Sequence, residues 1–310
     1  MGGVADETNR SDPFEIAGRL FDNRYQVAKK IGEGGMALVY RARDTATGED
    51  VALKILLPLF VEDVIAMKRL RREAELGVKL THKNLCAITR MGETDGRVYV
   101  VMPFLEGESL AARRWKAGQL SLATTADIVR DMSNGLHVAH ELGVIHRDLK
   151  PENVMIVPNP DGTERAVVLD FGLATEARDG DKRTKLTSAG TVVGTPEFMS
   201  PEQMRGRDLD RRSDVYSLAF MTSELLTGQL PFGGKTIHQM AMARMRGELI
   251  PLRQQRPDLD FPAAVERVLA KALAVDPAAR YPTALDFGTA FGRAANPGSF
   301  QRILGWFGQR

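Results

Sequence analysis

One stretch of twelve residues, "VIHRDLKPENVM" (144–155), constrains this chain more than any other feature. With the chain's own residue frequencies, the pattern His-Arg-Asp-x-Lys-x-x-Asn is expected by chance in only a few of about 10⁵ sequences of this length. A second segment, "LDFGLA" (169–174), follows an apolar run at 166–169 that predicts a strand delivering an aspartate to a cleft. The two segments together predict a site built from acidic, basic and amide side chains.

A glycine cluster, "IGEGGMALVY" (31–40), is a weaker signal. Gly32 and Gly34 have the G-x-G spacing of a phosphate-binding loop, but Ala37 stands where G-x-G-x-x-G has its last glycine. In a chain with 29 glycines among 310 residues, G-x-G is expected about three times by chance. Its meaning therefore depends on the segments around it.

The chain divides into a β-rich part and a larger helical part. From Tyr25, short β-rich runs alternate with turn residues and predict an antiparallel meander. The charged segment 62–80 has apolar residues at helical spacing and predicts a helix. Beyond about Gly107, helices are expected at 121–142, 213–228, 236–247 and 262–275, with a loop-rich stretch at 143–203.

In order and spacing, these segments resemble the protein kinase family, most closely bacterial Hanks-type serine/threonine kinases, from about residue 25 to 291. The resemblance implies an α+β, bilobal kinase fold. Its small antiparallel β-rich N-lobe has one main helix, and its larger C-lobe is mainly helical. We expect a flexible leader (1–24), an N-lobe (25–105), a C-lobe (106–292) and a tail (293–310) that holds a short amphipathic helix.

The resemblance assigns catalytic roles that fit the chemistry of phosphoryl transfer, which is mostly positioning and neutralisation of a polyanion. Lys54 of "VALK" is expected on the α and β phosphates, held by Glu73 of "RREAE", with Glu75 as the competing candidate. Asp148 is expected to orient the incoming hydroxyl and accept its proton. Lys150 is expected to neutralise the γ-phosphoryl group.

The same resemblance implies ATP and a divalent metal ion, Mg²⁺ with Mn²⁺ as an alternative. Asn153 and Asp170 offer the oxygen ligands that Mg²⁺ prefers. The expected nucleotide contacts are Ile31, Gly32, Glu33, Gly34, Gly35, Val39, Ala52, Lys54, Met102 as gatekeeper, Pro103, Leu105, Asn153 and Asp170. Pro103 replaces the family's usual glutamate but keeps its backbone carbonyl, so adenine binding is expected to survive. Together with these kinase-like segments, the glycine cluster is interpreted as a nucleotide site.

Further matches imply structural and regulatory roles. His146 and Phe171 are expected to serve packing. Glu202 of "GTPEFMSPEQ" is expected to form a buried pair with Arg280 of "DPAARYPTA". Asp214 of "SDVYSLAF" is expected to brace the loop that carries Asp148.

The segment between 173 and 200 resembles an activation segment. Arg147, beside the catalytic aspartate, can grip a phosphate with two hydrogen bonds. We expect autophosphorylation, in trans through self-association, at Thr187 first, with Ser188 and Thr191 behind it. Thr195, together with Lys150, indicates the serine/threonine type.

The composition of the chain limits the classes of partner and the compartment to be expected. A formal net charge of only +2 gives no reason to expect nucleic acid as a partner. The single cysteine, Cys86, fits a reducing compartment, and neither a secretory signal nor a transmembrane segment is recognisable, so we expect a cytoplasmic protein. Two alternatives stay open: a pseudokinase that only binds, and a phosphotransferase for small molecules. The long segment before residue 200 favours protein substrates with Ser or Thr.

Overall fold

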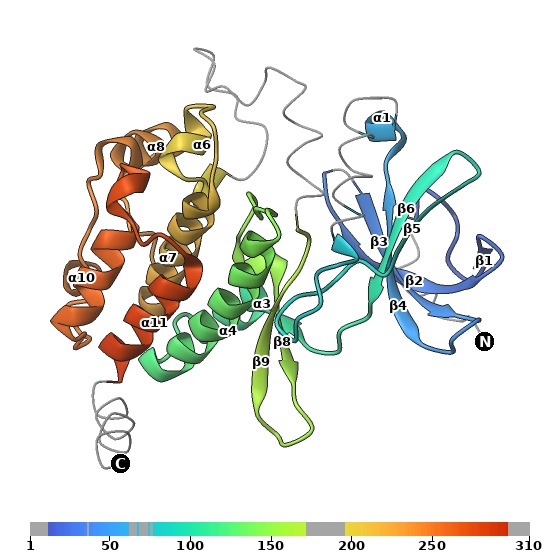
Figure 1. Cartoon of the computed structure of the whole chain (residues 1–310), viewed down its shortest axis with the longest axis horizontal. Coiled ribbons are helices and arrows are strands. Elements are labelled where there is room, and N and C mark those ends of the chain that lie inside the picture. The colour runs from blue at the N-terminus through green and yellow to red at the C-terminus, as the bar shows by residue number, and fades with distance from the viewer. Residues whose placement is uncertain are drawn as a thin grey trace, which may run out of the picture. The chain divides into compact units, whose positions relative to one another are not determined.

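The computed structural model describes residues 12–35, 37–61, 67, 74, 77–171 and 196–296. The chain divides into two compact units (Figure 1). In the described part, the first unit holds residues up to 81 and 86–106, and the second holds 82–85 and the residues from 107 onward. The change at 106/107 lies one residue beyond the expected boundary, and the segment 82–85 joins the second unit.

An antiparallel sheet forms the first unit. Its described strands have the order β1-β2-β3-β4-β6-β5, which makes it six-stranded. Their bounds, with that of one short helix, are Leu20–Phe21 (β1), Tyr25–Glu33 (β2), Ala37–Asp44 (β3), Asp50–Leu56 (β4), Pro58–Val61 (α1), Arg90–Thr94 (β5) and Arg97–Pro103 (β6). Side chains alternate along β4: Leu53 and Ile55 are fully buried, whereas Ala52 and Lys54 are only partly buried. One face of the sheet therefore carries the core.

Residues 12–24 differ from the expected flexible leader. Ile16 and Phe21 belong to the buried core of the first unit, and the Phe21 ring meets Tyr99 edge-on at 5.2 Å. The carboxylate of Asp12 accepts hydrogen bonds from the backbone N–H groups of Phe14, Ile16 and Ala17. The polar composition of this segment suggested a leader. A few apolar side chains are enough to dock it on the sheet because the Asp12 carboxylate satisfies the backbone N–H groups of the turn. Residues 1–11 lie outside the described residues.

The helix expected over 62–80 is described only in part. Met67 and Ala74 are helical and buried, as a core-facing pair at helical spacing requires. Glu73 and Glu75 lie outside the described residues.

The second unit is mainly helical. Its described helices are Leu110–Ala117 (α3), Leu122–Glu141 (α4), Pro201–Met204 (α6), Arg211–Thr227 (α7), Ile237–Arg246 (α8), Leu252–Gln255 (α9), Ala263–Ala272 (α10) and Ala284–Ala295 (α11). The described strands Glu108–Ser109 (β7), Val154–Pro158 (β8) and Glu164–Val168 (β9) form a small antiparallel sheet. The four expected helices are present within a few residues of their expected ends. The expected strand at 166–169 is β9.

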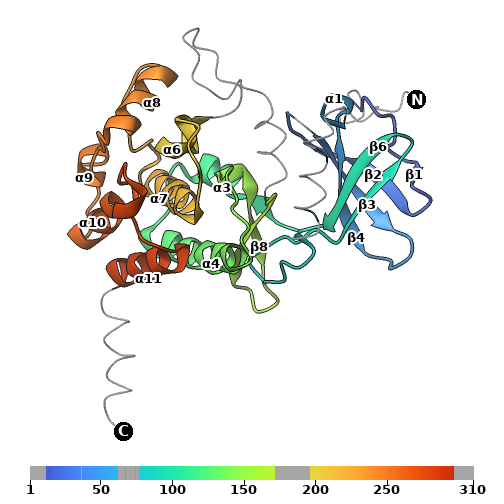
Figure 2. The same ribbon diagram turned by 45° about the horizontal axis from the view of Figure 1, so that its top comes forward.

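Helix α7 is the centre of this unit. Every residue from Ser213 to Thr227 is buried, and α7 packs against α4, α10 and α11 (Figures 1 and 2). The Asp210 side chain caps its first turn by accepting the Arg212 N–H at 2.8 Å. It ends at Gly228, whose φ of 71° favours glycine. Helix α11 runs three residues past the expected end of the C-lobe at 292, and residues 297–310 lie outside the described residues.

Candidate active site

The loop between α4 and β8 brings three of the predicted residues together. Lys150 Nζ lies 2.9 Å from Asp148 Oδ2, and Asn153 Nδ2 donates to the Asp148 backbone oxygen at 2.8 Å and to Oδ2 at 3.3 Å. About a quarter of the Asp148 and Lys150 side-chain surface is exposed, 24% and 23%. A reachable carboxylate is therefore held between an ammonium and an amide.

A buried aspartate, Asp214, anchors this loop through its backbone. Asp214 Oδ2 accepts the His146 N–H at 2.8 Å, and Oδ1 accepts the Arg147 N–H at 3.0 Å. His140 Nε2 lies 2.7 Å from Asp214 Oδ2. Burial alone would raise the pKa of Asp214, but the hydrogen bond from His140 and the nearby His146 hold that pKa below its ordinary value. The residue predicted to brace the loop thus contacts two consecutive backbone groups of it.

The backbone at Arg147 has an unusual conformation. Its φ of 66° lies in the left-handed region, which costs a residue with a Cβ about 1–3 kcal/mol and persists only where the surrounding structure enforces it. Asp170 has a φ of 55°. Two of the predicted site residues therefore occupy conformations that the chain around them must impose.

The Asp170–Phe171 segment follows β9 directly and packs on the catalytic loop. The Leu169 N–H donates to the Asn153 backbone oxygen at 2.9 Å, and His146 Nε2 lies 2.7 Å from the Leu169 backbone oxygen. The rings of His146 and Phe171 meet edge-on at 4.9 Å, and both residues are buried. These contacts join the Asp170 segment to the loop that carries Asp148.

In the first unit, the register of the sheet gathers the predicted nucleotide residues on one face. Val39 is paired with both Gly32 and Lys54, and Ala52 is paired with Met102. Directly paired residues share a face, as do residues two apart in a strand, so these five lie on the face opposite the buried Leu53 and Ile55. Pro103 pairs with Val51 at the end of β6. Ile31, Glu33, Gly35 and Leu105 are at least partly exposed nearby in the sequence.

The glycines of the loop are not required by the chain itself. Neither Gly32 nor Gly34 has a positive φ, and a Cβ added there would meet its nearest neighbours at 3.6 and 3.7 Å. The Gly34 N–H donates to the Ala37 oxygen at 2.9 Å and closes the turn. The fold itself would therefore tolerate a side chain at either position.

Glu202 and Arg280 form a buried ion pair. Two hydrogen bonds of 2.7 Å join the guanidinium to the two carboxylate oxygens, and Ser213 Oγ donates to Glu202 Oε1 at 2.7 Å. Burial would raise the pKa of Glu202, but Arg280 and the Ser213 hydroxyl hold it below the ordinary value. The pair joins α6 to the segment before α11.

Glu73, Thr187, Ser188, Thr191 and Thr195 lie outside the described residues.

The sequence analysis missed His140 and Gln203, although both leave a signal. His140 stands six residues before His146, in the last turn of α4, and Ser200 with Gln203 makes the S-x-x-Q pattern of a capping box.

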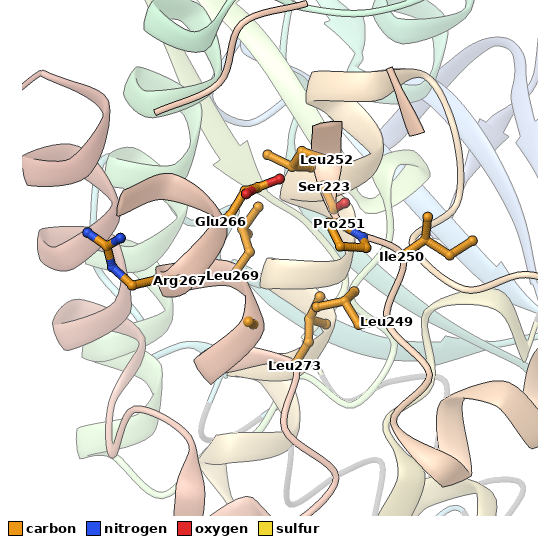
Figure 3. A pocket seen from close by; sticks show the side chains of 10 residues that line it. Ser223, Leu249, Ile250, Pro251, Leu252, Glu266, Arg267, Leu269 and Leu273 are labelled. Atoms are coloured by element: carbon orange, nitrogen blue, oxygen red, sulfur yellow. The ribbon is translucent and has the colours of Figure 1, made fainter. Parts of the chain in front are cut away.

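A separate hollow of about 200 Å³ lies in the second unit, between α7, α9 and α10 (Figure 3). Its lining is mostly aliphatic, with Leu249, Ile250, Leu269 and Leu273 among the side chains that Figure 3 labels. None of the predicted site residues lines it. In the part of the chain that the structure describes, no helix has the length and apolarity needed to cross a membrane.

Comparison with known proteins identifies the family. A family model described as the protein kinase domain matches residues 25–287. The chain belongs to the protein kinase family. Serine/threonine-protein kinase pkn3 of Myxococcus xanthus is 38% identical over 273 residues, which are 87% of this chain and 49% of that protein. Serine/threonine-protein kinase PrkC of Bacillus subtilis is 35% identical over 271 residues, 87% of this chain and 40% of that protein.

This kinase chain spans half or less of the length of those two relatives. Among solved structures, the kinase domain of Mycobacterium tuberculosis PknI, as a double mutant, matches with a TM-score of 0.70 and 26% identity over 90% of this chain and 98% of that one. The fold is the protein kinase fold, with a β-rich N-lobe and a helical C-lobe. Protein kinases as a family use ATP and divalent metal ions.

Proposed function

We propose that this chain is a serine/threonine protein kinase, which transfers the γ-phosphoryl group of ATP to Ser or Thr hydroxyls of proteins. The observation that supports it best is the Asp148 carboxylate, held by Lys150 and Asn153 on a loop that Asp214 anchors. A carboxylate in fixed geometry beside a cation suits a reaction in which positioning and charge neutralisation supply most of the catalysis.

Asp148 acts on the attacking hydroxyl. The hydrogen bonds that Asp148 accepts through its carboxylate from the described residues both go to Oδ2, so Oδ1 is left to accept the substrate hydroxyl. As the hydroxyl oxygen bonds to the γ-phosphorus, its proton passes to Oδ1 and the bond from that phosphorus to the β–γ bridging oxygen breaks, releasing ADP. Lys150, 2.9 Å from Oδ2, offers its positive charge to the transferred group.

The first unit binds the nucleotide. The face that carries Val39, Ala52 and Met102 presents aliphatic side chains suited to a purine ring, with backbone groups of Pro103 and Leu105 at its edge. Lys54 on the same face contacts the α and β phosphates, with Glu73 as its partner. Gly32 and Gly34 keep the loop free of side chains, which lets backbone N–H groups approach phosphate closely, since the chain itself does not need glycine there.

Asn153 and Asp170 are the ligands for Mg²⁺, with Mn²⁺ as the alternative ion. The side-chain nitrogen of Asn153 donates to Asp148, so the side-chain oxygen Oδ1 is the atom that would coordinate the ion. A neutral and a charged oxygen fit the few protein ligands that Mg²⁺ takes when phosphates supply the others. When bound, the ion neutralises phosphate charge.

Regulation and cellular context complete the proposal. Arg147 receives a phosphate on the activation segment, at Thr187 first and at Ser188 or Thr191 next, and a second copy of the kinase adds it. These three residues and Thr195 lie outside the described residues, so the support is the sequence pattern. A location in the cytoplasm is supported by the single cysteine, Cys86, which is buried and has no second cysteine in the chain with which to form a disulfide.

Labelled ATP tests the proposal. The wild type, alone and with a generic basic protein, should incorporate label into protein, and Asp148→Asn should bind nucleotide yet transfer slower by orders of magnitude. Nucleotide binding without transfer in the wild type would indicate a pseudokinase. Label appearing only in small molecules would indicate the other class of phosphotransferase.

A further inference from the structure

One side-chain amide links helix α6 to the catalytic loop. Gln203 Nε2 donates to the backbone oxygen of Arg147 at 2.6 Å. Its other amide atom, Oε1, accepts the Ser200 N–H at 2.8 Å, and the Ser200 hydroxyl in turn accepts the Gln203 N–H at 3.4 Å. Gln203 therefore belongs to the capping box of α6 and, at the same time, to the environment of the catalytic aspartate.

The Arg147 oxygen and the Asp148 N–H belong to the same planar peptide group. The Asp148 N–H donates to the His146 oxygen at 2.9 Å, and the Arg147 oxygen on the opposite edge accepts from Gln203. Since a peptide group rotates as a unit, fixing its two edges fixes the direction of the bond from its nitrogen to the Asp148 Cα, from which the side chain starts.

The preceding peptide is held independently. The Arg147 N–H donates to Asp214, so the peptides on either side of the Arg147 Cα have different anchors. Between them Arg147 adopts a φ of 66°, which persists only where the surroundings over-determine it. Without the bond from Gln203, the second of these peptides keeps the bonds from the Asp148 N–H to His146, at 2.9 Å to the backbone oxygen and 3.3 Å to Nδ1, but its oxygen loses its anchor and the peptide can relax toward an ordinary backbone conformation.

Helix α6 is a firm support for that bond. Glu202, the neighbour of Gln203, makes the buried pair with Arg280 and accepts from Ser213. The position of Gln203 is thereby set by contacts that do not involve the catalytic loop.

We propose that Gln203 is a positioning residue for phosphoryl transfer, whose Nε2 sets the orientation of the Arg147–Asp148 peptide and, through it, the Asp148 carboxylate. The inference rests on the proposed function, in which Asp148 receives the hydroxyl proton. The competing role is a helix cap alone, which needs Oε1 and not Nε2. The two roles of one amide can therefore be separated chemically.

Gln203→Glu separates them. Glutamate keeps the acceptor for Ser200 and places a carboxylate oxygen, without a hydrogen, against the Arg147 oxygen. We expect kcat to fall about tenfold or more, since small misplacements of a catalytic group cost that much, while KM for ATP stays within about threefold. The matched control is Gln255→Glu: that amide also donates to a backbone oxygen, of Ile250 at 2.7 Å, and accepts a side-chain bond, from Thr227 at 3.0 Å.

A pH series adds a readout that a purely structural role would not move. A protonated glutamate can donate its O–H to the Arg147 oxygen, so the ratio of Gln203→Glu to wild-type kcat should rise as the pH falls from about 8 toward about 5. The same ratio for Gln255→Glu should stay flat.

The outcomes are distinct. Gln203→Glu with wild-type kcat, or an equal loss in Gln255→Glu, overturns the role of Gln203 and leaves the proposed function standing. A wild type that is no faster than Asp148→Asn overturns the proposed function itself. If Gln203→Glu does not fold, Gln203→Met and Gln255→Met are compared by the same criteria, since methionine has similar length and no amide.

Discussion

Two buried glutamates in the second unit should respond in opposite ways to the same substitution. Glu202 and Glu224 are 5% and 6% exposed, and each faces an arginine. Arg280 holds both oxygens of Glu202. Arg114 lies 2.8 Å from Oε1 of Glu224, and the buried Oε2 of Glu224 accepts no hydrogen bond from the residues that the structure describes. Replacing either by glutamine preserves shape and removes the charge.

Glu202→Gln should lower the free energy of unfolding by about 3 kcal/mol. Removing one partner of a buried pair costs about 3–5 kcal/mol, because the other charge stays buried without compensation. Arg280 keeps three backbone acceptors, the oxygens of Ala274, Arg212 and Val275, so the lower end of that range applies. The melting temperature should fall by about 5 °C.

Near pH 7, Glu224→Gln should raise the free energy of unfolding, by about 3 kcal/mol at most. Burial raises the pKa of Glu224 to about 7 against the attraction of Arg114, and Glu197 and Glu152 add to the rise. A raised pKa means that the stability this group contributes is complete below its unfolded pKa, about 4.3, and is lost as the pH rises to about 7. Glutamine does not titrate, so the free energy of unfolding of Glu224→Gln should increase relative to that of the wild type as the pH rises from about 4.3 to about 7.

The pKa of Glu202 is lowered, so its contribution to stability depends on pH in the opposite direction. Its contribution should be present above the unfolded pKa of about 4.3 and be lost as the pH falls below it. Urea unfolding followed by helical circular dichroism, for both variants at several pH values, measures these differences. A loss under about 1 kcal/mol in Glu202→Gln, or equal losses in the two variants, would refute the reasoning.

Three further outcomes test the active site. Asp148→Asn should retain nucleotide affinity in a binding titration while its transfer rate falls by orders of magnitude; an unchanged rate would mean that another group is the base. Ala37→Gly should change KM for ATP only a few-fold, since added freedom and lost order are each worth under about 1 kcal/mol, and a hundredfold change in steady-state assays would contradict this. Mass spectrometry should find phosphate on Thr187 or its neighbours in the wild type and not in Asp148→Asn, and an unmodified segment in a fully active enzyme would exclude it as a requirement.

The sequence was informative where a feature is local. The ends of α4 and α7 were predicted within a few residues. The "HRD" segment, through its resemblance to the kinase family, predicted that Asp148, Lys150 and Asn153 share a site.

Features that depend on distant contacts were harder to predict. The bond from Gln203 to Arg147 spans 56 residues, and that between His140 and Asp214 spans 74. Residues 12–24 were assigned to a leader because their burial depends on Tyr99 and the other strands, which no local pattern of the segment reveals.

The enclosure of α7 bears on how the length of such a chain can vary. One residue inserted into a helix turns everything after it by about 100°, and between Ser213 and Thr227 no face of α7 is exposed to receive the displaced side chains. Insertions or deletions there would move Asp214 away from the loop it anchors or drive Glu224 and its neighbours into one another. The turn between β8 and β9, where residues 160–163 are exposed, can lengthen without such displacement. Length variation among relatives should therefore gather at that turn and be absent from α7.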